Sequence, residues 1–151
     1  MPYATTHLIG NEFAPKLDGK IDFFPWLDGT LVKVEIANLP SVNKTTNNQE
    51  NTGFFAFHIH EGSTCDDSED HFKMAKGHYN PTKKEHPFHA GDLPSLLSNN
   101  GYSFMTFYTS RFKPEDIIKK AVIVHLKPDD YRTQPSGDAG ERIACGIIVK
   151  N

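Results

Sequence analysis

Long hydrophobic runs are missing from this sequence of 151 residues. No apolar stretch approaches the roughly 20 residues that an α-helix needs to cross a bilayer, so we expect no membrane-spanning helix. The N-terminal residues do not place a basic segment before an apolar one, and we therefore expect no signal peptide. On this interpretation the protein is cytoplasmic. A cell-envelope or extracellular location stays open if a leader has been removed.

Dense positive charge is also missing. The formal net charge is -3 with neutral histidines, and no run of Lys and Arg could follow a phosphate backbone. We therefore expect neither a nucleic-acid partner nor a membrane partner. A homodimer is compatible with the composition, which does not determine the oligomeric state.

Cysteine is scarce, with only Cys65 and Cys145. Counting alone leaves two buried free thiols and one disulfide as equal alternatives. A bridge between these positions would close a loop of about 80 residues, for which the chain-entropy relation gives about 4–5 kcal/mol of stabilisation.

Apart from these absences, the sequence is dominated by patterns typical of short β-strands. Ten prolines and eleven glycines are spread along the chain and separate apolar or alternating runs. Strands are predicted at residues 7–9, 20–24, 30–36, 55–60, 102–108, 121–125 and 143–149, a short helix at 113–118, and polar loops at 41–52, 62–94 and 127–141. A further strand is expected to pair with 102–108 across Asn100-Gly101. The pattern predicts one all-β domain over residues 1–151, a sandwich or a barrel, with two long functional loops after the fourth strand.

The run FAFHIHE, at residues 55–61, places two imidazoles two positions apart. Alternate residues of a strand project to the same face, so His58 and His60 should lie side by side. Phe57 and Ile59 should then pack in the core behind them. One strand would thus present two nitrogen donors on a rigid support.

A second group of donors lies in the long loop. His86, His89 and Asp92 follow one another at steps of three, and a folded loop can bring such positions to one ion. Together with His78 they form a nitrogen and oxygen set suited to zinc, whereas an all-imidazole set suits copper. His125 ends a buried strand and is a further candidate. Seven donors for two four-coordinate metals would require one imidazolate to bridge both ions. His7 and His71 fit no such spacing, and we expect them to be solvent-exposed.

Five segments together resemble the motifs of copper/zinc superoxide dismutases: FHIHE, GHYNP, HAGDL, IVHLKPDD and SGDAGERIACGII, in this order. The resemblance runs from about residue 54 to the C-terminus and is nearer to the prokaryotic branch. It implies an eight-stranded Greek-key β-barrel, an immunoglobulin-like sandwich, with the metals on its outer face.

Carried over by position, the resemblance implies a complete site. The implied copper ligands are His58, His60, His78 and His125, and the implied zinc ligands are His78, His86, His89 and Asp92. His78 would be the bridge, Asp129 would link His58 to His86 from the outer shell, and Cys65 would pair with Cys145. Arg142 matches the arginine beside copper. The Lys/Glu cluster that usually guides the substrate is not recognisable, and Lys127 or Arg132 are candidates to replace it.

The implied activity is superoxide dismutation, in which copper alternates between two oxidation states, Arg142 binds the anion and His78 supplies a proton. One alternative is a non-catalytic protein that binds or delivers copper and zinc. A zinc hydrolase would need a carboxylate base beside an open zinc. Glu61 is the nearby candidate, and strand alternation points it to the other face. For Arg142 the alternative is a surface salt bridge with Glu141 or Asp138.

Overall fold

The chain folds almost entirely into strands in a computed structural model that describes residues 1–42, 51–68 and 70–151. The strands are β1 (Ala4–Gly10), β2 (Asp18–Trp26), β3 (Gly29–Ala37), β4 (Phe54–Phe55), β5 (Phe57–His60), β6 (Leu96–Leu97), β7 (Ser103–Thr109), β8 (Ala121–His125), β9 (Arg142–Ile147) and β10 (Val149–Lys150). Two short 3-10 helices, η1 (Lys73–Ala75) and η2 (Pro114–Ile117), are described as well. No described helix is long and apolar enough to cross a membrane.

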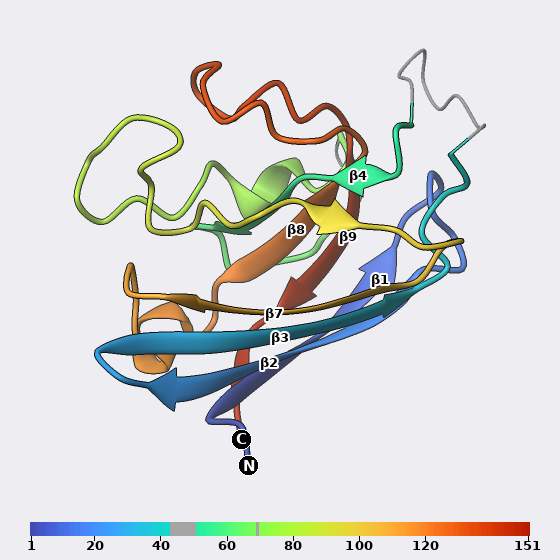
Figure 1. The fold of residues 1–151 in the computed structure, drawn as a ribbon. Helices are drawn as coiled ribbons and strands as arrows, with labels where there is room; N and C mark the ends of the chain where they lie inside the picture. The colour runs from blue at the N-terminus through green and yellow to red at the C-terminus, as the bar shows by residue number, and fades with distance from the viewer. Residues whose placement is uncertain (43–50, 69) are drawn as a thin grey trace.

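One eight-stranded sheet forms most of the molecule. Its strand order is β5-β8-β9-β1-β2-β3-β7, with β10 paired to β1, and the strand pairs are antiparallel. The sheet curls around the core into a half-barrel, as Figure 1 shows. The small β4–β6 ladder adds to the wall, because β4 runs into β5 and β6 lies against β7. The predicted all-β barrel class is confirmed.

Alternation along β3 shows how the sequence forms this sheet. Val32, Val34 and Ile36 are completely buried, while Glu35 on the opposite face is exposed. The two-residue turn Leu27-Asp28 joins β2 to β3 as a hairpin, with Trp26 opposite Gly29. The apolar faces of the strands thus line one continuous core inside the barrel.

Two details differ from expectation. Asn99 and Tyr102 form a bridge across the predicted turn, but β6 pairs with β4 and not with β7. The helix predicted over 113–118 is a single 3-10 turn that begins at a proline. The predicted loop at 41–52 lies mostly outside the described residues.

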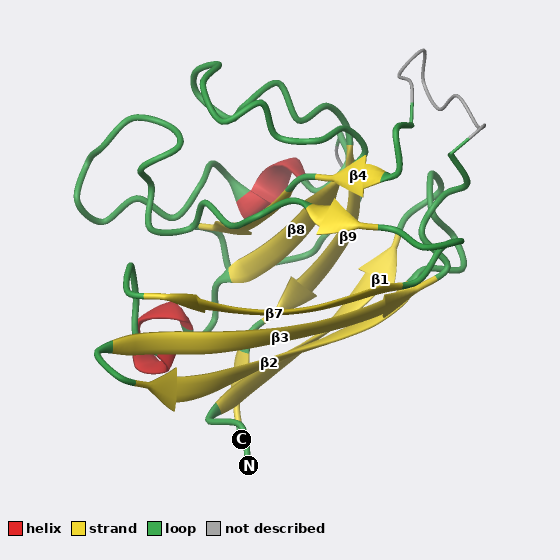
Figure 2. Ribbon diagram, in the orientation of Figure 1, coloured by secondary structure: helices red, strands yellow, loops and turns green. Residues whose placement is uncertain are grey.

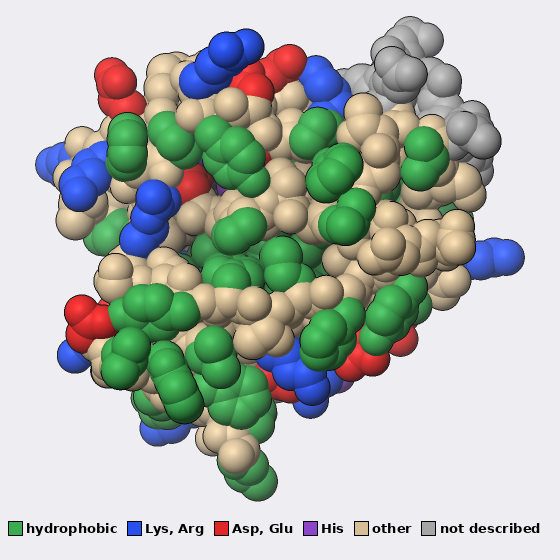
Figure 3. Space-filling model, in the orientation of Figure 1, with side chains coloured by type: hydrophobic (Ala, Val, Ile, Leu, Met, Phe, Trp, Pro, Cys, Tyr) green, Lys and Arg blue, Asp and Glu red, His purple; other side chains and the backbone are tan. Residues whose placement is uncertain are grey.

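The long loops gather on one side of the sheet, above β8 and β9, as Figure 2 shows. On the face that Figure 3 presents, hydrophobic side chains gather between these loops and β7. A cavity of about 400 Å³ lies there and is lined by residues that include Leu93, Pro94, Phe107 and Tyr108.

Candidate metal centre

Strand β5 presents the histidine pair of FAFHIHE as predicted. Phe57 and Ile59 are completely buried in the barrel core. His58 and His60 project to the opposite face, where the loops cover them to 0% and 1% exposure. The pair is therefore held by core packing on one side and enclosed by loops on the other.

The open edge of β5 explains how the long loop reaches these histidines. The N–H of Ile59 donates to the carbonyl of Gly91 at 2.9 Å, and its carbonyl accepts from the N–H of Tyr79 at 2.8 Å. These bonds satisfy an edge that would otherwise stay unpaired. They also set the register, because isolated bridges place Asp92 opposite His58 and His78 opposite His60.

Four imidazoles converge on the first site. Each of His58, His60, His78 and His125 offers a ring nitrogen, and these nitrogens lie within 4.8 Å of one another. Nε2 of His60 lies 3.3 Å from Nε2 of His125. The two rings come from neighbouring strands, since β5 pairs with β8.

Three imidazoles and a carboxylate converge on the second site, which consists of His78, His86, His89 and Asp92. Nδ1 of His78 lies 2.7 Å from Oδ1 of Asp92 and 3.3 Å from Nδ1 of His89. His78 belongs to both groups, with Nδ1 at this second site. The loop thus folds so that His86, His89 and Asp92, which are three residues apart in sequence, surround one point.

The hydrogen bonds show which nitrogens remain available. Nδ1 of His60 donates to the carbonyl of Lys76 at 2.8 Å, so a neutral ring presents a lone pair at Nε2. Nδ1 of His58, Nε2 of His78 and Nδ1 of His86 are buried without any hydrogen-bond partner among the described residues. Buried polar atoms are rarely left unpaired, and converging lone pairs are what a cation needs. The donor sets therefore fit a metal at each site.

Asp129 links the two sites from outside. Its Oδ2 accepts from Nε2 of His58 at 2.7 Å, and its Oδ1 accepts from Nε2 of His86 at 2.8 Å. Because a carboxylate can only accept, both rings donate outward and direct Nδ1 toward the metal sites. The contact requires Gly137, where an added Cβ would lie 1.9 Å from Oδ1 of Asp129. His58, His86 and Asp129 thus form a hydrogen-bonded group in which the carboxylate orients the two histidine rings.

Electrostatics favour neutral imidazoles in the centre. Burial, together with neighbouring histidines, holds the pKa of His58, His60 and His125 well below the ordinary value. Burial also lowers the pKa of His78, although its hydrogen bond with Asp92 opposes the shift. For Asp92 burial raises the pKa, but the hydrogen bond and charges of the histidines outweigh it and the pKa is lowered. These five donors are therefore in the protonation states that metals bind.

Arg142 lies at the start of β9 beside the first site. Its guanidinium donates to the carbonyl of Phe72 at 2.9 Å and to the carbonyl of Lys76 at 2.7 Å. With His60, His78 and His125 it lines a cavity of about 440 Å³. The alternative partner Asp138 instead forms an ion pair with Lys127 at 2.8 Å. That pair also offsets the charge of Lys127, which was a candidate to guide an anion.

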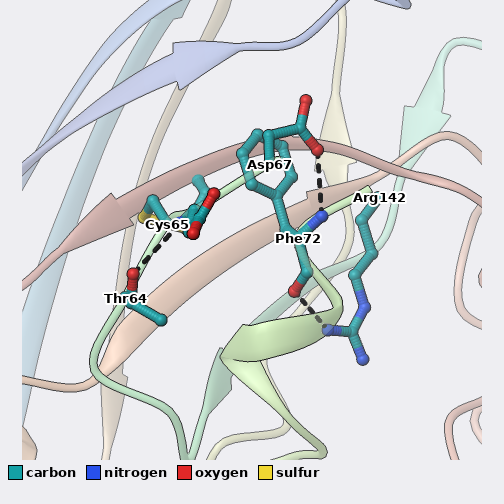
Figure 4. The surroundings of a disulfide bond; sticks show 7 residues. Thr64, Cys65, Asp67, Phe72 and Arg142 are labelled. Atoms are coloured by element: carbon teal, nitrogen blue, oxygen red, sulfur yellow. Dashed lines mark hydrogen bonds between the residues drawn. A yellow bond between two sulfur atoms is a disulfide. The ribbon is translucent and has the colours of Figure 1, made fainter. Parts of the chain in front are cut away.

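The predicted disulfide is confirmed. Cys65 is bonded to Cys145, so the loop that carries Phe72 is attached to β9, the strand that carries Arg142. Figure 4 shows this arrangement, with the disulfide on one side of Phe72 and the guanidinium on the other.

Sequence analysis missed two side chains that hold the second site. Arg111 follows β7 and donates to the carbonyls of Pro87 at 2.7 Å and His89 at 3.1 Å. Gln134 accepts from the N–H of His86 at 3.0 Å and donates to its carbonyl at 2.7 Å. In both cases a side chain bonds to backbone groups of a segment that is distant in sequence. No spacing of residues in the sequence indicates such bonds.

The expectation for the two remaining histidines was half right. His7 is exposed. His71 is only partly exposed, and its ring lies within 4 Å of three carboxylates, those of Glu12, Glu141 and Asp70.

The fold is a curled β-barrel, and its two adjoining histidine-rich sites share one imidazole. Together these features define the class of protein as a β-barrel metalloprotein with a dinuclear centre. A family model described as copper/zinc superoxide dismutase (SODC) matches residues 28–148. The superoxide dismutase [Cu-Zn] 1 of Aquifex aeolicus is 37% identical over 155 residues, covering 93% of this chain and 84% of the relative.

Solved structures agree. A Cu/Zn superoxide dismutase from Brucella abortus superposes with a TM-score of 0.76 at 26% identity, covering 95% of this chain and 98% of that one. A mutant of a SOD-like protein from Bacillus subtilis superposes with a TM-score of 0.78 at 29% identity, covering 96% and 97%. The chain belongs to the copper/zinc superoxide dismutase family, and this membership implies copper and zinc as its metals.

Proposed function

We propose that the protein is a superoxide dismutase whose copper is held by His58, His60, His78 and His125 and whose zinc is held by His78, His86, His89 and Asp92. The shared position of His78 supports this assignment most strongly. Its Nδ1 lies with Asp92 and His89, and its buried Nε2 points to the other group without a partner. A single structural ion would not need both nitrogens of one ring.

Copper supplies one-electron redox chemistry, by which two superoxide ions become dioxygen and hydrogen peroxide. The chain's own residues supply position, charge and protons. His78 could hold a proton at Nε2 while its Nδ1 stays at the second site, and it could deliver that proton to the nascent peroxide, which would take its second proton from water. Asp129 keeps the rings of His58 and His86 in one orientation during this exchange.

Arg142 is proposed to bind the anionic substrate. Two of its donor nitrogens are occupied by backbone carbonyls, which fixes the plane of the guanidinium at the wall of the cavity that His60, His78 and His125 also line. A planar, permanently charged group in this place attracts a small anion. Since the net charge of the chain is -3, the attraction has to be local.

Two other functions are less well supported. A non-catalytic copper and zinc protein would need the ligands but not Arg142, and the SOD-like neighbour from Bacillus subtilis shows why activity has to be measured. A zinc hydrolase would need a base at the zinc. Glu61 forms an ion pair with Lys120 at 2.8 Å and is half-exposed, so it does not meet that need.

The compartment is part of the proposal. The Cys65–Cys145 disulfide favours an oxidising environment, such as the cell envelope. The cytoplasmic location expected from the N-terminal sequence is therefore the less well supported alternative, and the homodimer stays a prediction.

Metal analysis of the purified protein, an EPR spectrum of the copper-loaded form and a dismutation assay together test the proposal. We expect one copper and one zinc per chain and rapid removal of superoxide. His125→Gln should abolish activity, whereas His7→Gln, which changes an exposed histidine, should not. A fully loaded protein that does not consume superoxide would instead establish the binding or delivery function.

A further inference from the structure

A turn of unusual conformation holds Arg142. Asp70, His71 and Phe72 have φ angles of 44°, 50° and 61°, which are three consecutive left-handed residues without a glycine. Each such residue is unfavourable by itself, so the surroundings have to restrain the turn. Its last residue provides the carbonyl that accepts from Nη1 of Arg142 at 2.9 Å, as Figure 4 shows.

His71 lies at the centre of this turn, and the contacts of its side chain restrain the turn. Its Nε2 lies 3.0 Å from Oε1 of Glu12, and its Nδ1 lies 3.1 Å from Oε2 of Glu141. The ring also packs against Phe13, with centroids 4.6 Å apart. One side chain thus connects the turn after β1, the disulfide loop and the residue directly before Arg142.

The two contacts favour the charged ring. Nε2 of His71 donates to Oε1 of Glu12, whereas the contact of Nδ1 with Glu141 is an ion pair. A neutral ring would keep the hydrogen bond but lose the ionic attraction to both carboxylates. The hydrogen bond with Glu12 accordingly raises the pKa of His71; burial lowers it, and the charges of Glu141, Glu12 and Asp67 raise it further.

The charges around His71 lie close to the proposed substrate path. A groove of about 240 Å³ is lined by Asp70, His71, Lys73, Gly140, Glu141 and Arg142. Gly140 and Arg142 also line the cavity at the first metal site, so the two spaces adjoin. Among the described residues, His71 therefore faces the acidic Glu12, Asp67, Asp70 and Glu141, with the cationic Lys73 and Arg142 across the groove.

We propose that His71, as an imidazolium bridging Glu12 and Glu141, is a positioning residue for Arg142 and offsets the acidic charge beside the path of superoxide. The proposal rests on the proposed dismutase function. Loss of the proton removes the ionic attraction of His71 for Glu12 and Glu141, loosens the turn that ends at Phe72 and removes one positive charge near the anion's route. Both effects weaken capture of superoxide by Arg142 as pH rises.

Kinetics of the copper- and zinc-loaded enzyme test the effect on substrate. From about pH 7 to about pH 10 we expect the rate constant of the wild type to fall roughly two- to fivefold in a single step as His71 loses its proton. His71→Gln should lack this step and stay near the wild-type value at high pH. His71→Arg, which keeps a charge, should retain the low-pH rate up to about pH 9. The control His7→Gln should keep the step. An unchanged step in His71→Gln would overturn the proposal.

NMR of the reduced, copper(I)- and zinc-loaded protein tests the structural part without an assay of activity. The ring of His71 should titrate above its ordinary value of about 6.5. The amide of Phe72 and the guanidinium Nε–H of Arg142 should follow the same titration, and Glu141→Gln should lower the pKa of His71. A pKa of His71 at or below the ordinary value would contradict the proposed bridge between Glu12 and Glu141. This measurement is made on the wild type and does not depend on whether a variant folds. An inactive holoprotein with this titration intact would instead refute only the proposed function.

Discussion

Oδ2 of Asp129 lies 2.7 Å from Nε2 of His58, and the two side chains are fully buried. The residues are 71 positions apart in sequence, so the C-terminal loop has to fold back over β5 to make this contact. The same carboxylate reaches His86 with its other oxygen. One side chain therefore orients a ligand of each proposed metal site.

Asp129→Asn should weaken metal binding without removing any ligand. The amide can accept from only one of the two rings, so either His58 or His86 loses its orientation. Loss of an outer-shell partner typically costs about 10–100-fold in metal affinity, and we expect zinc affinity to fall by this factor in chelator competition. Glu115→Gln changes an exposed carboxylate in η2, outside the metal-site loops, and should leave the affinity unchanged. Equal affinities for Asp129→Asn and the wild type would remove Asp129 from the metal centre.

Arg142→Ala should lower the dismutation rate constant at least about tenfold, because the fixed positive charge at the cavity wall is lost. The rate should also depend less on ionic strength, since the attraction that salt screens is gone. Pulse radiolysis of the fully loaded variant measures both. Lys16→Ala, which removes an exposed positive charge that lines neither cavity beside Arg142, serves as the control and should change the rate much less. If Arg142→Ala turned over at the wild-type rate, the guanidinium would have no part in substrate binding.

Cys145→Ser should destabilise the protein by about 2–5 kcal/mol, the usual range for a native disulfide in a small domain. The bond joins positions 80 residues apart and holds the loop that carries the partners of Arg142. Urea denaturation gives the free energy of unfolding. Cys65→Ser and the double variant should show the same loss, because each removes the same bond. Additive losses would mean that packing of the thiols, and not the bridge, supplies the stability.

Arg111→Gln should loosen the loop of the second site. Two carbonyls, those of Pro87 and His89, would lose a charged donor, and we expect a loss of about 1–2 kcal/mol after allowing for partial exposure. Hydrogen exchange of the loop amides should accelerate and zinc affinity should decrease. Lys113→Gln, close by in sequence and exposed, should show neither change. Unaltered exchange in Arg111→Gln would show that the loop is held by other contacts.

Local patterns in the sequence predicted much of the fold. Alternation along 55–60 placed the core face of that strand correctly, because a strand directs successive side chains to opposite faces whatever surrounds it. The pairing of β6 with β4 was missed, since a two-residue strand has no periodicity of its own. The resemblance identified the disulfide, a pairing that spacing alone left open.

The sequence by itself determined which donors are present: two imidazoles on one strand, three donors at three-residue steps in a loop, and an arginine in a family motif. Only the tertiary structure decided which nitrogen of each ring faces a metal site, because that choice depends on partners such as Lys76 and Asp129 that are distant along the chain. It also decided that Arg111 and Gln134 support the loop and that His71 lies between two carboxylates. These contacts depend on where the barrel brings its loops together, and no local pattern contains that information.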